Sequence, residues 1–87
     1  MALVTLLHRF ADYDTFRRVY DAADGLRQSG GVSDHSVHRM ADDPNNILVL
    51  HYFDSVEKAR AYLGNPELKD AMQQAGMQGE PRIEFYE

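Results

Sequence analysis

Four stretches of the chain carry apolar residues in patterns typical of β-strands. Residues 46–53 (NILVLHYF) are apolar at successive positions, which favours a strand covered on both faces. Residues 3–10 alternate between two faces, and residues 81–87 alternate more weakly. Residues 32–40 are more polar, which suits an edge strand. One face of the first strand carries Val4, Leu6, His8 and Phe10.

Two helical segments are expected between these strands. Apolar side chains recur at steps of three and four residues along one stripe, namely Tyr13, Phe16, Tyr20, Ala23 and Leu26 or Arg27. Asp12 is expected to cap this helix, and residues 29–31 (SGG) to end it. A second helix is expected to follow Asp54 as its N-cap. Residues 64–66 (GNP) interrupt that helix, and their asparagine can cap a further short helix that ends at Gly76.

This order of elements predicts an α+β fold, with one domain spanning residues 1–87. Strand, helix, strand, strand, helix pair and strand form a ferredoxin-like βαββαβ plait, in which a four-stranded antiparallel sheet carries helices on one face only. Nothing in the chain is left to cover the other face, which holds Leu3, Leu7, Leu48 and Leu50. Because so much exposed apolar surface is unfavourable in water, the sequence predicts a homodimer that packs sheet against sheet.

Three histidines occupy strand positions that favour a shared site. His8 and His51 each lie two residues before a strand-ending phenylalanine, which is expected to pack beneath the helices, so both share that face. Their strands are expected to be neighbouring and parallel, and the two imidazoles therefore to lie close together. His35 joins them if Val37 faces inward. The sequence thus predicts a cleft between sheet and helices, with His8, His35 and His51 as catalytic residues.

The chemistry expected of this cleft is proton transfer. A neutral imidazole exchanges a proton at cellular pH, so the cluster could ionise an activated carbon or an electron-rich phenol. Arg39 and either Tyr13 or Tyr52 are candidate donors to an oxyanion. Aromatic side chains would form an apolar wall for a ligand. The candidate substrate-binding residues are Tyr13, Phe16, Arg39, Tyr52, Phe53 and Met72.

Each of these assignments has a structural alternative. A histidine in a strand is often a hydrogen-bonded structural residue, and the aromatic stripe of the first helix equally suits a core. Met72 can be a packing residue or a mobile lid. Three histidines also match the ligand number of some metal sites. Here they would come from three strands, without the close spacing of a metal motif, so we expect no metal.

Composition and charge exclude several classes of function. The 87 residues contain no cysteine, which excludes disulfides, thiolate nucleophiles and iron–sulfur clusters. The net charge of -5 argues against nucleic acid as a partner. No apolar run approaches the roughly 20 residues that span a bilayer, so no membrane association is expected. The start of the chain lacks a basic segment and a cleavage site, which favours a cytoplasmic location. Glycine-rich phosphate loops are absent, and no cofactor is expected.

The sequence resembles the dimeric α+β barrel superfamily, which includes antibiotic-biosynthesis-monooxygenase-like domains and small bacterial cyclase-like proteins. The likeness covers nearly the whole chain. The matching segments are residues 8–13 (HRFADY), 31–35 (GVSDH), 41–45 (ADDPN), 52–55 (YFDS), 65–72 (NPELKDAM) and 79–81 (GEP). The resemblance implies a homodimeric barrel whose ligand lies in the cleft between sheet and helices. Many oxygenase-type members carry a tryptophan at the end of the third strand, where this chain has Phe53.

That departure argues against oxygenase chemistry, so the first hypothesis is a cyclase or isomerase. It would act on an aromatic or polyketide-like compound by histidine acid–base chemistry. The alternatives are a cofactor-independent monooxygenase on the same scaffold, a non-catalytic ligand-binding or stress-related dimer, and a structural dimer without a ligand. The superfamily hosts all of these chemistries, so the fold alone does not choose between them.

Overall fold

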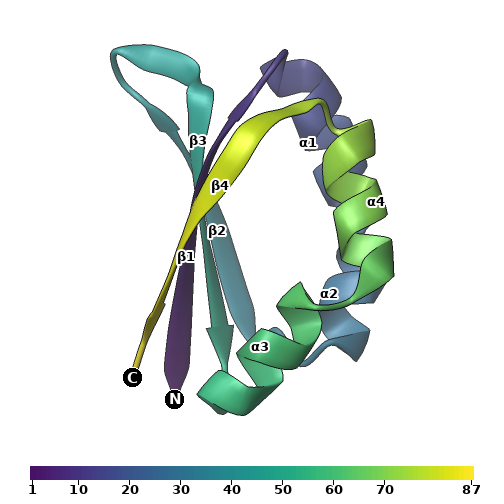
Figure 1. Cartoon of the computed structure of the whole chain (residues 1–87), viewed down its shortest axis with the longest axis vertical. Coiled ribbons are helices and arrows are strands. Elements are labelled where there is room, and N and C mark those ends of the chain that lie inside the picture. Colours follow the sequence, from purple (N-terminus) through teal and green to yellow (C-terminus); the bar gives the residue numbers. More distant parts are fainter.

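A four-stranded antiparallel sheet carries four helices on one of its faces in the computed structural model, which describes residues 1–87 (Figure 1). The strands are β1 (Ala2–Phe10), β2 (Asp34–Met40), β3 (Asp43–Phe53) and β4 (Met77–Tyr86). The helices are α1 (Tyr13–Ala22), α2 (Asp24–Ser29), α3 (Val56–Leu63) and α4 (Pro66–Gln74). The strand order β2-β3-β1-β4 confirms the ferredoxin-like plait. None of the helices is long and apolar enough to cross a membrane.

The ends of most helices lie where the capping residues predict them. The Asp12 carboxylate accepts a hydrogen bond of 3.0 Å from the Thr15 backbone N–H at the start of α1. Asn65 caps α4 in the same way, with Pro66 as the first helical residue. Gly76 follows α4 with a φ of 85°, a conformation that glycine adopts without strain. The expected Asp54 cap is wrong.

The N-cap of α3 is Ser55, one residue later than expected. Its hydroxyl accepts a hydrogen bond of 3.2 Å from the Lys58 backbone N–H. Asp54 instead forms an ion pair of 3.2 Å with the Lys58 ammonium group, four residues along the chain. Aspartate and serine are both common N-cap residues. Here the helix begins at Val56, so the residue directly before it, Ser55, is the N-cap.

The first helix is broken at Ala23, where the sequence predicted a single continuous helix. In an unbroken helix the Tyr20 carbonyl would accept from the N–H four residues later. Here it accepts a hydrogen bond of 2.6 Å from the guanidinium of Arg27 and one of 3.2 Å from the Ala23 N–H. The buried arginine thus satisfies a carbonyl that the break leaves free. The break turns α2 so that Arg27, rather than Leu26, is the buried residue.

Two strands begin earlier than their prolines suggested. Residues 41–46 (ADDPNN) have the composition of a turn, but only Ala41 and Asp42 form one, and β3 takes in Pro44. Likewise β4 begins at Met77, not at residue 81, and takes in Pro81. Both prolines lie at register shifts, where extra residues interrupt the ladder and a missing N–H costs nothing. Pro44 and Pro81, which suggested strand boundaries in the sequence, therefore lie at β-bulges.

The core lies between the helices and the inner face of the sheet. The alternation predicted for the central strands is confirmed: Val4, Leu6 and Phe10 of β1 are buried, as are their counterparts Ile47, Val49 and Phe53 of β3. Helix residues that complete this layer are Phe16, Tyr20, Ala59, Tyr62 and Ala75.

Two imidazoles belong to the same buried layer. His8 is 5% exposed and His51 is 4% exposed. Burial lowers the pKa of His8 to about 4. Burial lowers the pKa of His51 to about 3, with a further contribution from the nearby positive charge of Arg27. Both rings are therefore neutral at physiological pH.

The opposite face of the sheet has no helix over it (Figure 1). Leu3, Leu7, Leu48 and Leu50 lie there and stay partly exposed. Polar residues of the edge strands surround them, among them His38 of β2 and Glu84 of β4. This arrangement of apolar centre and polar rim is what the dimer prediction requires.

We expect the protein to elute in gel filtration at about twice the 9.9 kDa chain mass, because sheet-to-sheet packing would remove the four leucines from water. Leu48→Glu should convert it to a folded monomer, since a carboxylate at the centre of that face cannot be buried without a partner. Ala61→Glu, on an exposed position of α3, is the matched control and should leave the dimer intact. Elution of the wild-type chain at its own mass would refute the expectation.

We expect stability to fall as pH drops from 7 to 5, because the unfolded chain binds protons at His8 and His51 near pH 6.5 while the folded chain does not. Stability is complete above pH 6.5 and decreases toward pH 4, by about 2 kcal/mol per histidine at pH 5. His8→Leu should remove about half of this loss in urea titrations at a fixed protein concentration. His38→Leu, at an exposed histidine, should show the wild-type loss; equal losses in both variants would contradict the assignment.

Candidate functional site

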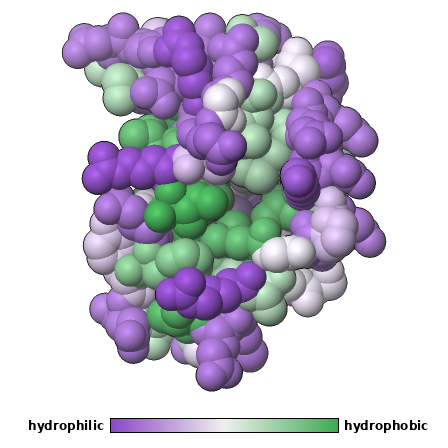
Figure 2. Space-filling model, viewed as in Figure 1, coloured by the Kyte–Doolittle hydropathy of each residue, from purple (hydrophilic) through white to green (hydrophobic).

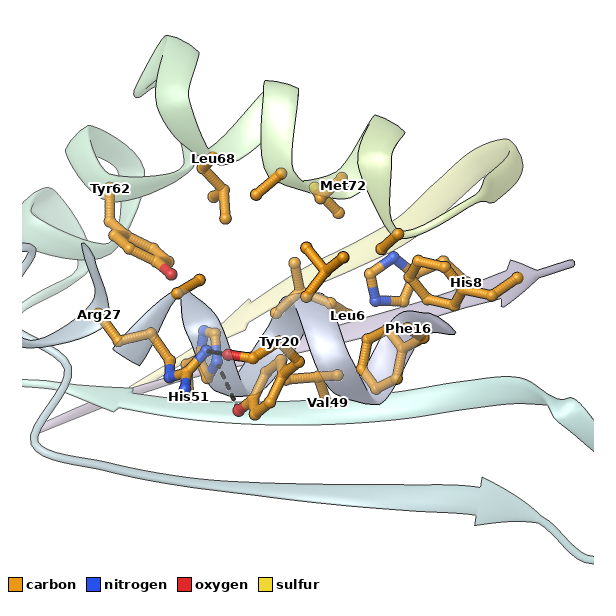
Figure 3. A pocket seen from close by; sticks show the side chains of 15 residues that line it. Leu6, His8, Phe16, Tyr20, Arg27, Val49, His51, Tyr62, Leu68 and Met72 are labelled. Carbon is orange, nitrogen blue, oxygen red and sulfur yellow. Dashed lines mark hydrogen bonds between the residues drawn. The ribbon is translucent and has the colours of Figure 1, made fainter. Parts of the chain in front are cut away.

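An apolar cleft lies between the inner face of the sheet and the helices α1 and α4 (Figure 3). Twelve of its fifteen lining residues are hydrophobic. The cavity has a volume of about 50 Å³, and the hollow encloses about 490 Å³ when its open mouth is included. Figure 2 shows apolar side chains gathered around this hollow between sheet and helices. The polar lining residues are His8, Arg27 and His51, together with the hydroxyls of Tyr20 and Tyr62.

Arg27 supplies a buried positive charge at one end of the cleft. Its side chain is 4% exposed, and its guanidinium carbon lies 3.8 Å from the centroid of the Tyr20 ring, a cation–π contact. One terminal nitrogen donates to the Tyr20 carbonyl, and the other lies 3.5 Å from the Asp24 carboxylate. The Nε–H has no partner. A buried cation with a free donor is suited to hold an anionic oxygen.

His51 of β3 lies beside this cation. Its Nε2 is 3.4 Å from the Tyr20 hydroxyl, and its buried Nδ1 has no partner (Figure 3). The Tyr62 ring packs against it with the ring centroids 5.7 Å apart. A buried polar atom without a partner is unusual in a folded protein and indicates a place where a ligand or water binds. This end of the cleft therefore combines a fixed cation with a neutral, unsatisfied imidazole.

Two tyrosine hydroxyls complete this end. Burial raises the pKa of Tyr62 to about 12 and raises that of Tyr20 as well, so both stay protonated and can donate. The Tyr62 hydroxyl points into the cleft (Figure 3). Its ring lies over Gly30, where any Cβ would collide with it. The close approach thus requires glycine at that position.

His8 marks the opposite end of the cleft. Neither of its ring nitrogens has a partner, although the side chain is buried. The residue lies at the β-bulge between β1 and β4, where three residues of β4, 79–81, stand opposite it. Bulges often redirect a side chain next to a functional site. His8 is thus a second unsatisfied imidazole, packed against Phe10 with ring centroids 4.6 Å apart.

The expected closeness of His8 and His51 is wrong. Their strands are neighbours, as predicted, but β1 and β3 run antiparallel. In the observed register His51 stands opposite Val4 and His8 opposite Ile47, four residues apart along the strands. At about 3.3 Å per residue, the Cα atoms of the two histidines are roughly 13 Å apart along the strand direction. The two imidazoles therefore lie at opposite ends of the cleft and not beside each other (Figure 3).

His35 joins His51 on the inner face of the sheet, as expected if Val37 packs inward, but it does not line the cleft. It lies on the edge strand β2 and is exposed. Its Nδ1 is nevertheless 2.7 Å from the Tyr20 hydroxyl, and its ring centroid is 6.1 Å from that of His51. No three histidine, aspartate or glutamate side chains converge in a way that could hold a metal.

The predicted substrate-binding residues divide between the cleft and other surfaces. Phe16 of α1 and Met72 of α4 line the cleft. Phe53 is fully buried in the core beside it and contacts the Tyr62 ring instead. Tyr52 lies on the open face of the sheet, because it follows His51 in the strand and neighbouring side chains point to opposite faces.

Tyr13 and Arg39 lie outside the cleft and bind each other. The guanidinium carbon of Arg39 is 4.0 Å from the centroid of the Tyr13 ring, and its Nε donates to the Pro44 carbonyl at 3.1 Å. Neither is a lining residue. The groups in the cleft that could donate to an oxyanion are those of Arg27 and Tyr62. The position of Arg27 on the inward stripe of the first helix was the signal in the sequence.

Comparison with known proteins places the chain in a family. The family model described as antibiotic biosynthesis monooxygenase matches residues 9–74. A search of the curated proteins finds no significant match. Among solved structures, a protein from Bordetella bronchiseptica named as an antibiotic biosynthesis monooxygenase has a TM-score of 0.83 at 10% identity, over 99% of this chain and 94% of that one.

Two further solved structures show the same fold. A protein from Caulobacter crescentus with the same designation has a TM-score of 0.78 at 19% identity, over 98% of this chain and 86% of the other. SnoaB from Streptomyces nogalater, a cofactor-independent oxygenase, has a TM-score of 0.76 at 13% identity, over 99% and 89%. At these identities the structural likeness concerns the fold. The matched sequence, however, runs from Arg9 in β1 to the end of α4, and the chain therefore belongs to the antibiotic biosynthesis monooxygenase family.

Proposed function

We propose that the protein is a cofactor-independent monooxygenase that oxidises an electron-rich phenol bound in the cleft. The family membership and the likeness to a cofactor-independent oxygenase support this alternative over the cyclase or isomerase hypothesis. The observation that carries the proposal is the pairing of the buried Arg27 cation with the unpartnered Nδ1 of His51 at one end of an apolar cleft. Such an end suits a phenol that must lose its proton.

The first step is ionisation of the phenol. Its hydroxyl would lie against the guanidinium of Arg27 and the hydroxyl of Tyr62, both of which stabilise a phenolate oxygen. The free Nδ1 of His51 would accept the proton. In the apolar cleft these charged contacts are stronger than in water, since few polar groups compete with them.

Dioxygen then acts as the oxidant. A phenolate carries electron density on its ring carbons, and one of these forms a bond to O₂ to give a peroxide that takes up a proton. Loss of the ring hydrogen at that carbon and departure of the distal oxygen as water leave a quinone. One oxygen atom enters the product, the other becomes water, and the substrate supplies all four electrons. The apolar walls of Leu6, Val49 and Leu68 keep bulk water away from the intermediate.

The size of the cleft requires it to open for such a ligand. The cavity volume of about 50 Å³ is far below the roughly 300–1,000 Å³ of typical ligand pockets. The helix α4 is the element suited to move, because none of its side chains is fully buried. It contributes Met72 and Leu68 to the cleft, and both are only partly buried. The unbranched side chain of Met72 is also flexible.

The imidazole of His8, at the opposite end of the cleft, limits the class of substrate that the site would bind. His8 offers a second hydrogen-bonding group four residues along the sheet from His51, with the two Cα atoms roughly 13 Å apart. A ligand that bonds to both imidazoles needs two polar atoms that are well separated. Two fused aromatic rings with one hydroxyl on each ring meet this requirement. We therefore use 1,5-dihydroxynaphthalene as the probe, with 1-naphthol as its one-ended counterpart.

We expect the protein to oxidise 1,5-dihydroxynaphthalene to 5-hydroxy-1,4-naphthoquinone with one molecule of O₂ consumed and one of water formed. Under ¹⁸O₂, mass spectrometry should find one labelled oxygen in the product, above a protein-free control. Binding without turnover would instead support the non-catalytic alternative. A product formed equally well without O₂ would support the isomerase or cyclase reading.

Arg27→Met should lower kcat about 10²- to 10³-fold, because it removes the charge that stabilises the phenolate. Arg27→Lys keeps the charge and should retain part of the activity, which separates the electrostatic role from a general loss of packing. Arg18→Met, at an exposed arginine of the same helical region, is the control and should have wild-type kcat. Oxygen-electrode rates, with thermal melts of each variant, test this; wild-type kcat in folded Arg27→Met would exclude the role.

His8→Leu should weaken binding of 1,5-dihydroxynaphthalene about 10-fold, the loss of one good hydrogen bond. Binding of 1-naphthol, which has no second hydroxyl to reach His8, should change less than twofold. Fluorescence titration of both ligands under anaerobic conditions gives the comparison. Equal weakening of the two ligands would show that His8 does not select for length.

A further inference from the structure

The Tyr20 hydroxyl lies between two histidines that face different environments. On one side it is 3.4 Å from Nε2 of the buried His51, and on the other 2.7 Å from Nδ1 of His35 (Figure 3 shows the His51 contact). His51 lines the cleft and its buried Nδ1 has no partner, whereas His35 is exposed on the edge strand. Three side chains from β3, α1 and β2 thus form a continuous hydrogen-bonded path from the cleft to solvent.

The chemistry of these groups permits one ordered arrangement of protons that points outward. If Nε2–H of His51 donates to the Tyr20 oxygen, the Tyr20 O–H donates to Nδ1 of His35. The Nδ1 of His51 then holds a lone pair, which is the form a base needs. The 3.4 Å contact is long, as such bonds often are before a substrate binds.

We propose that His51, Tyr20 and His35 form a proton relay that carries the substrate proton from the cleft to the protein surface. This inference rests on the proposed oxidation of a phenol. The phenolic proton moves to Nδ1 of His51 while the Nε2 proton of that ring moves to the Tyr20 oxygen. The Tyr20 proton moves to Nδ1 of His35. The net change is one phenol converted to phenolate and one neutral His35 converted to its cation, and no charge stays on His51.

The relay explains how the substrate proton can leave the cleft although His51 is a weak base. His51 alone is a poor final acceptor, since burial lowers its pKa to about 3 while an ordinary phenol such as tyrosine has a pKa of about 10. An imidazole in contact with water can hold and release the proton. The same path, run in reverse, returns a proton to the peroxide so that water can leave.

The charges around the relay favour outward movement. The cation of Arg27 lies against the Tyr20 ring and disfavours a positive charge on His51. Asp34 lies next to His35, and its carboxylate accepts from the His35 backbone N–H at 2.9 Å. The other charged groups that act on Tyr20 are Arg17, Asp21 and Asp24.

The proton arrangement can be tested without any turnover. Long-range ¹H–¹⁵N spectra of the free protein above pH 7 should show His51 protonated at Nε2 and His35 unprotonated at Nδ1. Tyr20→Phe removes only the hydroxyl and should let the tautomers of both rings change. Finding His51 protonated at Nδ1 would overturn the proposal, because that ring would then be unable to accept from the substrate.

Turnover supplies the second test, with 1,5-dihydroxynaphthalene as substrate. Tyr20→Phe and His35→Ala should each lower kcat about 10²-fold while the anaerobic affinity for the ligand changes less than twofold. Added imidazole should restore part of the rate to His35→Ala, because the lost ring is exposed, but none to Tyr20→Phe. His38→Ala, on the same strand and the opposite face, should have wild-type kcat. Wild-type kcat in His35→Ala, or no rescue by imidazole, would refute the relay.

The two proposals fail separately. If the wild-type chain incorporates no labelled oxygen, the proposed function is wrong, and the spectra still decide whether the relay is arranged outward. If the wild-type chain is active and the Tyr20→Phe and His35→Ala variants have the same kcat, the proposed oxidation is supported and the relay is refuted.

Discussion

The hydrogen bond from Arg27 to the Tyr20 carbonyl is the interaction on which the site depends. It satisfies the carbonyl that the break after α1 leaves free, and it places a guanidinium inside an otherwise apolar cleft. The same guanidinium lies over the Tyr20 ring and thereby fixes the hydroxyl between two histidines. Backbone geometry, charge and the orientation of the hydroxyl are thus determined by one side chain.

A buried cation of this kind is stable only because it is surrounded by acceptors. The Tyr20 carbonyl, the Tyr20 π-face and the half-exposed Asp24 carboxylate share its charge, although none neutralises it alone. The nearby His51 adapts by staying neutral. An anionic ligand would complete the set of partners, which explains how a site of this composition can favour the ionised form of a substrate over the neutral form.

The sequence predicted the fold well because the fold follows from local patterns, above all the alternation of buried and exposed positions along the strands. The faces of β1 and β3, the caps at Asp12 and Asn65 and the end of α4 at Gly76 each depend on local residue patterns. The site was predicted less well because it depends on contacts between elements. The antiparallel register that separates His8 from His51 and the helix break that buries Arg27 are set by tertiary geometry, and no spacing along the chain encodes them.

Chemistry could be read from the sequence only in part. His8 and His51 do face the cleft, since their phase within the strands is local information. Tyr52 was misplaced although its phase, opposite to that of His51, was available. Tyr62 could not be assigned at all, because its position depends on the absence of a side chain at Gly30, which lies on a distant turn.

The bulge beside His8 also affects how copies of the chain can associate. Opposite this residue the edge strand β4 bends at Gly79, which has a φ of 73°, and Pro81 offers no N–H. A continuous row of donors and acceptors is what an incoming strand needs in order to extend a sheet sideways. Its interruption disfavours growth into open-ended fibrils along that edge, so that the irregularity opposite His8 also protects the sheet from polymerisation.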